Sequence, residues 1–185
     1  APTGVVLETH RLTLKIPHPD EAAQVAKFYA DNHDFLAPWD PVRPAEFTTT
    51  SHQRTCIEAA HEQWLTDKAL RLLVYRKNDP TPVGAVNFTN IVRGSLQQCY
   101  LGYLLGAEAQ GNGYMTEALQ AAIPWVFEHV GVHRITAEYM PRNARSAAVL
   151  ARLGFATEGR KASYLKIAGR WEDHICCALV NPREL

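Results

Sequence analysis

The amino-acid sequence predicts an α/β (α+β) domain built on one mixed sheet, and three observations carry the prediction. Apolar patterning gives the order strand, two helices, three strands, helix, strand, helix and two strands. One strand passes through a glycine-bearing turn directly into a helix. No linker-like stretch interrupts the 185 residues, 46% of which are hydrophobic. We therefore expect a single domain over residues 1–185, with about six to seven strands and about four helices.

The first half of the chain supplies three strands and two helices. Residues 5–16 predict a strand, because apolar and polar side chains alternate from Leu12 to Ile16, and Pro17 and Pro19 end it. Asp20 is expected to cap the first helix. Prolines at 38, 41 and 44 predict a stiff loop over residues 35–44. The predicted helices span residues 21–30 and 48–67, and the next strands span residues 70–75 and 83–91 with a turn at 78–80.

The second half predicts four strands and two helices. A helix over residues 113–130 has an apolar face and ends at Gly131, although Pro124 should kink it. A shorter helix starts at residues 141–143 and ends before Gly154. The predicted strands span residues 99–105 and 134–139, followed by a closing hairpin of residues 164–167 and 171–179.

Composition excludes several classes of protein. Nineteen Lys and Arg residues balance 19 Asp and Glu residues, whereas nucleic-acid binders that work by charge carry a net positive field. No apolar run approaches the roughly 18–20 residues of a membrane helix, and no signal-like segment opens the sequence. We therefore expect a cytoplasmic protein with no direct nucleic-acid site and no membrane partner.

The cysteines and histidines do not predict a metal site. The four cysteines lack a CxxC spacing, and the adjacent Cys176 and Cys177 should point to opposite faces of a strand. His61-Glu62 begins like a zinc-protease motif, but Leu65 stands where the second histidine must be. We expect no metal and reduced, buried thiols.

The segment from Tyr103 to Leu119 indicates a phosphate ligand. Gly111 and Gly113 allow a tight turn and a close backbone approach before a helix starts. Free N–H groups and the positive dipole end of that helix attract phosphate. A P-loop would need Lys after Gly113, and a dinucleotide fingerprint would need glycine where Thr116 stands. The pattern therefore predicts a pyrophosphate-type ligand bound in some other way.

Four stretches together resemble the GNAT superfamily of N-acetyltransferases. Its pyrophosphate loop is similar to Gln110-Gly111-Asn112-Gly113 of this sequence. In the ribosomal-protein N-acetyltransferase branch, the run that follows this loop is similar to Thr116-Glu117-Ala118-Leu119. Residues 143–146 with Leu153-Gly154-Phe155 resemble its Asn-x-x-Ser … Leu-Gly-Phe helix. Residues 8–14 look like its first strand. Met115 departs from the small residue of the wider family, but a bulky residue is usual in this branch.

Two further stretches are similar to the RimJ type of ribosomal-protein-alanine N-acetyltransferases. These are residues 35–43 and residues 87–94 with 99–103. The resemblance covers nearly the whole chain. It implies a GNAT fold with a V-shaped cleft for acetyl-coenzyme A, between the strand ending near Leu105 and the strand beginning near His133.

The resemblance also implies roles for individual residues. Backbone groups of Tyr103, Leu104 and Leu105 would pair with the pantetheine arm, and the Leu105 N–H would polarise the thioester carbonyl. Asn143 would cap its helix and bond the pantetheine chain, and Ser146 would protonate the departing thiolate. The pyrophosphate site would comprise Gln110, Gly111, Asn112, Gly113, Tyr114, Met115 and Thr116.

The acceptor side is less defined by the sequence. Related enzymes carry a carboxylate just before the tyrosine matching Tyr164, and here that residue is Ser163. An α-amino group, with a pKa near 7.7–8.0, needs less help to lose its proton than lysine does. Aromatic character suggests Trp39, Tyr103 and Tyr164 for the acceptor pocket, and Trp39 most of all because prolines flank it.

The resemblance implies an acetyl-coenzyme A-dependent enzyme that acetylates a protein N-terminus, the N-terminal alanine of a small-subunit ribosomal protein. We expect direct transfer in a ternary complex, without an acyl-enzyme. Two alternatives stay open at this stage. One is an acetyltransferase for a small-molecule amine, and the other is a non-catalytic module that binds acetyl-coenzyme A or the ribosome.

Overall fold

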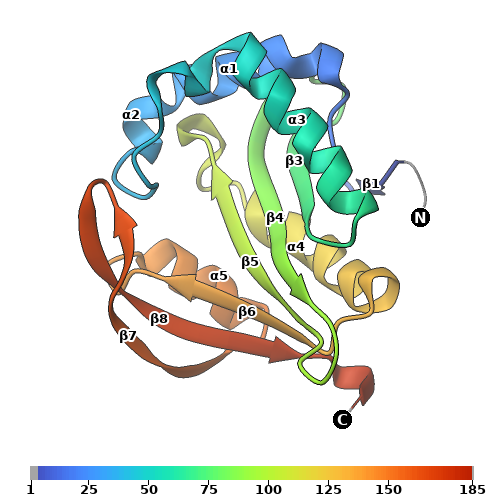
Figure 1. Ribbon diagram of the computed structural model, residues 1–185, viewed down its shortest axis with the longest axis vertical. Helices are drawn as coiled ribbons and strands as arrows, with labels where there is room; N and C mark the ends of the chain where they lie inside the picture. Colours follow the sequence, from blue (N-terminus) through green and yellow to red (C-terminus); the bar gives the residue numbers. More distant parts are fainter. Residues whose placement is uncertain (1–3, 185) are drawn as a thin grey trace.

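A computed structural model describes residues 4–184, and its strands form one mixed sheet in the order β1-β2-β3-β4-β5-β6-β8-β7 (Figure 1). All neighbours are antiparallel except β5 and β6. The α/β class is therefore confirmed, with eight strands in the described part. The strands are β1 (Val6–Glu8), β2 (Leu12–Lys15), β3 (Leu70–Arg76), β4 (Pro82–Val92), β5 (Gln98–Leu105), β6 (Arg134–Tyr139), β7 (Ala156–Ile167) and β8 (Arg170–Val180).

Within residues 4–184, five α-helices and several short turns of helix connect these strands. The α-helices are α1 (Ala22–Asp31), α2 (His33–Leu36), α3 (Thr50–Leu65), α4 (Tyr114–Trp125) and α5 (Ala144–Arg152). The short helical turns are η1 (Pro19–Glu21), η2 (Ala45–Thr48), η3 (Ala107–Ala109), the π-helical turn η4 (Val126–Val130) and η5 (Pro182–Glu184). Helices α1 and α3 pack on one face of the sheet, and α4 and α5 pack on the other (Figure 1).

The first predicted strand, over residues 5–16, is in fact a hairpin of two strands. A tight turn between β1 and β2 is closed by a hydrogen bond from the Thr9 N–H to the Leu12 carbonyl. The Thr9 hydroxyl and the Arg11 N–H both donate to Glu117 of α4. This carboxylate lies more than a hundred positions further along the chain, so the local pattern of residues 5–16 did not reveal the turn.

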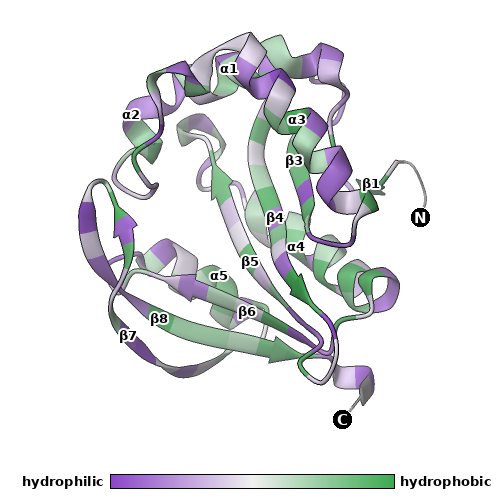
Figure 2. Cartoon of the chain, viewed as in Figure 1, coloured by the Kyte–Doolittle hydropathy of each residue, from purple (hydrophilic) through white to green (hydrophobic). Residues whose placement is uncertain are grey.

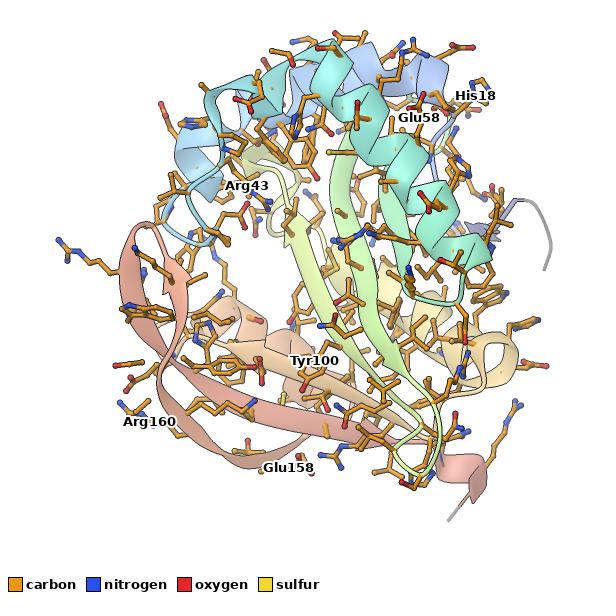
Figure 3. All side chains as sticks on the ribbon, viewed as in Figure 1. His18, Arg43, Glu58, Tyr100, Glu158 and Arg160 are labelled. Carbon is orange, nitrogen blue, oxygen red and sulfur yellow. The ribbon has the colours of Figure 1, made fainter. Side chains whose placement is uncertain are left out.

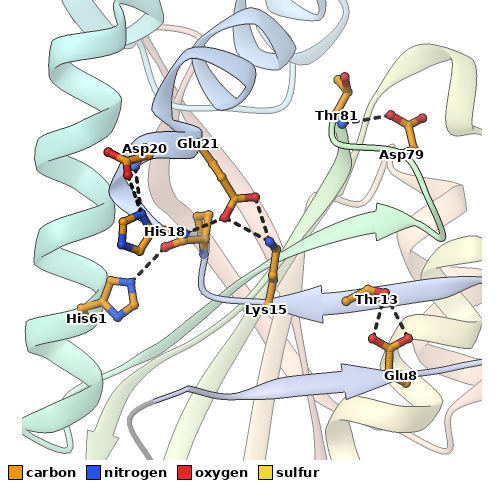
Figure 4. A network of polar contacts seen from close by, with 10 residues as sticks. Glu8, Thr13, Lys15, His18, Asp20, Glu21, His61, Asp79 and Thr81 are labelled. Carbon is orange, nitrogen blue, oxygen red and sulfur yellow. Dashed lines mark hydrogen bonds and ion pairs between the residues drawn. The ribbon is translucent and has the colours of Figure 1, made fainter.

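The start of α1 also differs from the prediction (Figure 4). His18, rather than Asp20, is the capping residue: its Nδ1 accepts from the Asp20 N–H, and its own N–H donates to Glu21. Glu21 also holds Lys15 at 2.8 Å. These contacts build η1 first, so that α1 begins only at Ala22.

The predicted loop over residues 35–44 contains the end of a helix. Helix α2 runs to Leu36, and the proline-containing stretch that follows has no regular helix until η2. The prediction was therefore right for residues 37–44 only. Leu36, the last residue of α2, is buried.

The predicted helix over residues 113–130 is continuous through Pro124 but changes its winding. Helix α4 passes into η4 at Val126, and Gly131 ends it in the left-handed conformation with φ 70°. Proline lacks the N–H that an α-helix needs at that point. The wider i→i+5 turn follows directly after it, which is where such irregular turns are commonly found.

Strand β7 is much longer than the predicted segment of residues 164–167. It begins at Ala156 and pairs with β8 along the edge of the sheet. Most of its residues are exposed and hydrophilic (Figure 2), and Figure 3 places Glu158 and Arg160 on this outer strand. An edge strand without a buried face gives no alternating pattern, so the sequence showed only its end.

The hydrophobic core lies chiefly between the central strands and α4. Leu12, Leu72, Phe88, Leu119 and Ile135 are completely buried there. A smaller cluster joins α1 and α3 to the opposite face through Val25, Ile57, Leu73, Tyr75 and Ala85. This two-sided packing fixes the position of β5, on which the site is built.

Candidate functional site

Strands β5 and β6 separate part of the way along their length and so form the expected V-shaped opening. They pair in parallel only from Gln98 with Arg134 to Leu101 with Ala137. On its other side β5 stays paired with β4 as far as Leu105. The last residues of β5 therefore have one backbone edge that is not covered by β6 (Figure 1).

The direction of the backbone groups on this edge follows from the ladder. The Gly106 N–H donates to Val83 at 2.8 Å and so points toward β4. Because successive N–H groups alternate in an antiparallel pair, those of Leu105 and Tyr103 point into the opening. The Leu105 carbonyl also points there, since it accepts from the Gln110 side chain at 3.0 Å. A linear amide ligand could pair with this edge as an added strand does.

The glycine turn after β5 places backbone N–H groups at the mouth of the opening. Gly111 and Gly113 have φ values of 78° and 75°, which only glycine adopts at little cost. Gly113 is the N-cap of α4, and Asn112 steadies the turn by donating to the carbonyls of Ala109 and Gln110. The start of a twelve-residue helix is a favourable place for phosphate.

Two contacts that the sequence did not reveal anchor this turn. The Asn32 side chain at the end of α1 accepts from the Ala107 N–H at 2.8 Å. Glu117 in the first turn of α4 holds Arg11 at 2.7 Å, and the Arg11 guanidinium lies 4.7 Å from the centre of the Tyr114 ring. Both link residues that are far apart along the chain, so local patterns could not indicate them.

Asn143 and Ser146 face the opening from the start of α5. The Asn143 side chain accepts from the Ser146 N–H at 3.1 Å and caps the helix, as expected. The Ser146 hydroxyl lies 2.7 Å from the Tyr103 hydroxyl. The sequence predicted both residues but did not indicate that they form a pair.

The Tyr103 phenol remains protonated over the physiological range. Burial raises the pKa of Tyr103 to about 12, and the hydrogen bond with Ser146 opposes this rise only in part. Tyr103 can therefore donate a proton in its hydrogen bond while Ser146 keeps its own hydroxyl proton for another acceptor.

A cavity of about 630 Å³ joins these features. Of the predicted site residues, it is lined by Trp39, Tyr103, Leu104, Leu105, Gln110, Met115, Asn143 and Ser146. Gly111, Asn112, Gly113, Tyr114 and Thr116 do not line it and form the turn and first helical residues beyond its end. The open strand edge, the glycine cradle and the volume together fit an elongated ligand with a phosphate at one end.

The other end of the cavity is formed by α2 and the loop after it. Phe35, Leu36, Pro38 and Trp39 line this end. The tip of the β7–β8 hairpin closes on the same loop, because the Ala168 N–H donates to the Asp40 carbonyl at 2.9 Å, and Figure 1 shows the two segments approaching. Arg43, at the far end of this loop and labelled in Figure 3, lies 3.2 Å from Asp40 and stacks on the Phe47 ring.

Tyr164 is placed apart from the cavity. Its ring lies 5.9 Å from that of the buried His174, and the Lys161 ammonium lies 4.1 Å from its centre. The predicted acceptor residues are thus divided, with Trp39 and Tyr103 inside the cavity and Tyr164 outside it.

The thiols are not positioned for chemistry in this cavity. None of the described residues that line it is a cysteine. Burial raises the pKa of Cys99 to about 12 and that of Cys177 to about 11. Cys176 and Cys177 point to opposite faces, as predicted, since their sulfurs contact Glu138 and the Ala137 carbonyl respectively. All four cysteines are free.

Two searches of residues 4–184 bear on other classes of site. No group of three or more His, Cys, Asp or Glu side chains in that range is arranged to hold a metal ion. No helix among the same residues combines the length and apolar character that a bilayer crossing requires.

Fold and site together define an acetyltransferase with an acetyl-coenzyme A cleft. Residues 11–156 match the family model described as acetyltransferase (GNAT) domain. The chain belongs to this family of acetyl-coenzyme A-dependent N-acetyltransferases. The expected class of fold and of enzyme is therefore confirmed.

Within that family the chain is similar to ribosomal-protein acetyltransferases. It is 41% identical to the [ribosomal protein uS5]-alanine N-acetyltransferase of Escherichia coli strain K12, over 96% of this chain and 92% of that protein. The structure of ribosomal-protein-S5-alanine acetyltransferase from Vibrio fischeri matches with a TM-score of 0.92 at 35% identity, covering 96% and 97% of the two chains. RimJ of Mycobacterium smegmatis in complex with CoA-disulfide matches with a TM-score of 0.88 at 25% identity, covering 98% and 88%.

Proposed function

We propose that this protein transfers an acetyl group from acetyl-coenzyme A to the N-terminal α-amine of a protein, namely the N-terminal alanine of a small-subunit ribosomal protein. The observation that carries the proposal is that one cavity is lined by the open edge of β5, by Trp39 and by Ser146. The names of the relatives, which are 41% and 35% identical, support the acceptor.

The chain would hold the donor mainly by its backbone. The N–H and carbonyl groups of Tyr103 and Leu105 point into the opening and would pair with the amides of the pantetheine arm. The side chain of Asn143 would add a bond to the same arm. Residues 111–116, with Gln110 fixing the turn, would direct N–H groups at the pyrophosphate.

Two groups would assist the transfer. The Leu105 N–H, fixed by the β4–β5 ladder, would stabilise negative charge as it develops on the thioester carbonyl oxygen. The Ser146 hydroxyl, held by Tyr103 at 2.7 Å, would give its proton to the departing thiolate. We propose direct transfer in a ternary complex, which the lack of cysteine among the described lining residues supports.

The acceptor would enter from the α2 side of the cavity. Trp39 and Tyr103 would contact the first residue of the acceptor, and Tyr164, outside the cavity, would meet a later part of the peptide. Asp34 is the only carboxylate among the described lining residues, and its side chain is fully exposed. We therefore propose that water removes the proton from an α-amine whose pKa is near 7.7–8.0.

The acetyltransferase domain would extend over residues 1–185, beyond the matched residues 11–156. The support is that β1, β7 and β8 belong to the same sheet as the matched strands. A ribosomal-protein acceptor would place the reaction in the cytoplasm.

A peptide panel tests this proposal. Purified protein and acetyl-coenzyme A are incubated with a peptide that begins with alanine and carries an internal lysine, and with the same peptide blocked at its N-terminus. Acetylation of the free peptide alone, at the α-amine by fragment-ion mass spectrometry, is the expected result. Acetylation of the blocked peptide's lysine, or of polyamines and aminoglycosides only, would favour the small-amine or lysine alternatives. Tight cofactor binding without any transfer would favour a binding module.

A further inference from the structure

Arg142 connects three separate parts of the acceptor end of the cavity. It lies in the turn between β6 and α5 and lines the cavity itself. Its guanidinium carbon is 4.9 Å from the centre of the Trp39 ring. Its Nη2 donates to the Pro38 carbonyl at 3.2 Å and lies 3.3 Å from Glu172 of β8.

These contacts hold the loop between α2 and η2, which has few other restraints. Between α2 and η2 the chain has no regular secondary structure, and most of its residues are exposed. The Ala168–Asp40 bond ties this loop to the hairpin tip. Arg142 supplies another long-range contact, next to Trp39, from more than a hundred positions away in the sequence.

The chemistry of arginine suits this position. A guanidinium is flat, so it can lie on the indole face while its edge still donates to a carbonyl and a carboxylate. Lysine would keep the positive charge but would lack the planar group of N–H donors. Glu172 in turn restrains Arg142 from β8, so the orientation of Trp39 depends on the β6–α5 turn and on the hairpin together.

We infer that Arg142 is a positioning residue that sets the indole of Trp39 and thereby the shape of the acceptor end. The expected effect on acceptor kinetics rests on the proposed function, in which Trp39 contacts the acceptor. Arg142 acts through Trp39 and takes no part in proton transfer. Its loss should weaken recognition of the acceptor while leaving the donor site unchanged.

The kinetic test uses Arg142→Gln, Trp39→Leu and the double variant with the alanine-initiated peptide. Arg142→Gln should raise the acceptor KM about three- to fivefold, the size of an exposed cation–π contact, with kcat and the acetyl-coenzyme A Kd little changed. In the Trp39→Leu protein, Arg142→Gln should cause no further increase in the acceptor KM. The inference would be overturned if the increases in acceptor KM from the two single substitutions were fully additive in the double variant, or if Arg142→Gln left the acceptor KM unchanged.

A second measurement needs no activity and so separates this inference from the proposed function. The fluorescence of Trp39 is obtained by subtracting the Trp39→Leu spectrum, and its quenching by acrylamide is compared with and without Arg142→Gln. Trp39 should become more accessible to quencher in Arg142→Gln and partly so in Glu172→Gln. Arg152→Gln, which removes an exposed cation at the end of α5, serves as the control and should change nothing. Unaltered quenching in Arg142→Gln would contradict the inference even if peptides are acetylated.

Discussion

Ser146 and Tyr103 show how single residues acquire a role from their neighbours. Ser146 stands in the first turn of a capped helix, where a serine is unremarkable in sequence. The hydroxyl becomes a candidate acid because β5 brings a protonated phenol to 2.7 Å from it. The phenol orients the serine, and the serine is the group nearer to the cofactor arm in the proposed arrangement.

Replacing Ser146 by alanine should lower kcat by about 10²-fold or more, the range found for a positioned acid. The cap would persist, since Asn143 bonds the backbone N–H of residue 146 rather than its side chain. The Kd for acetyl-coenzyme A, measured by calorimetry, should therefore stay within about twofold. Ser95→Ala in an exposed loop is the matched control, and an unchanged kcat in Ser146→Ala would remove Ser146 from the mechanism.

The dependence of the rate on pH should follow the pKa of the acceptor amine rather than the pKa of Tyr103. Only a neutral amine attacks, so kcat/KM for an alanine-initiated peptide should rise with pH and level off above a pKa of about 8. Because the pKa of Tyr103 is raised to about 12, its ionisation should cause no fall in rate up to pH 10. A rise centred near 10.4 would instead indicate a lysine acceptor. Stopped-time assays from pH 6 to pH 10 would distinguish the two profiles.

Sequence patterns predicted local backbone features of the candidate site but did not reveal its long-range contacts. The glycine turn was visible because left-handed backbone restricts the choice of residue, and Asn143 was visible because caps favour few residue types. Asn32, Glu117 and Arg142 were missed as partners of the site. Each acts through contacts with distant segments, and no local periodicity records such contacts.

At the scale of elements, the cleft depends on how β5 is held between its neighbours. Strand β4 supports it over the whole length, whereas β6 leaves it after Leu101. The turn that follows is packed closely against α1. A side-chain carbon on Gly106 would lie 2.8 Å from the Asn32 Oδ1 and 3.0 Å from a Phe28 ring carbon.

Gly106→Ala should therefore disturb both stability and donor binding. Overpacking at this site should cost about 1–3 kcal/mol, and displacement of Asn32 would release the Ala107 N–H at the start of the cofactor turn. We expect a lower melting temperature by calorimetry and weaker acetyl-coenzyme A binding. Gly102→Ala on the preceding strand, β5, is the control, since nothing lies within 4 Å of its added carbon. Equal stability and affinity of the two variants would show that α1 does not restrain the turn.

The elements with a buried face were predictable, and those at the edges were not. Helices α1, α4 and α5 have an apolar face with a helical period, and strands β3 to β6 carry runs of buried apolar residues. Most of β7 has neither face buried, and two irregularities interrupt its pairing with β8. The hairpin of β1 and β2 depends on Glu117 across the molecule, so its turn could not be located from residues 5–16.

For the whole molecule, the balanced charge of the chain fits an enzyme with an enclosed site rather than a charged binding surface. Nineteen cations are offset by 19 anions, and many are paired across strands, as Lys161 is with Glu138 and Arg160 with Asp173. Two cationic side chains, Arg142 and Arg145, line the cavity, and oriented backbone N–H groups of the glycine turn can add to the attraction for an anionic donor. The fold, the cavity and the similarity to ribosomal-protein acetyltransferases agree on this account.

The central claim is that the acceptor is the N-terminal alanine of a small-subunit ribosomal protein. Its most direct test is mass spectrometry of total ribosomal proteins, unacetylated at the start, after incubation with the enzyme and isotope-labelled acetyl-coenzyme A, with Ser146→Ala as the parallel control. The account predicts label on the α-amine of one small-subunit protein that begins with alanine, reduced in the control. Label confined to lysine side chains, or no label on any ribosomal protein, would contradict it.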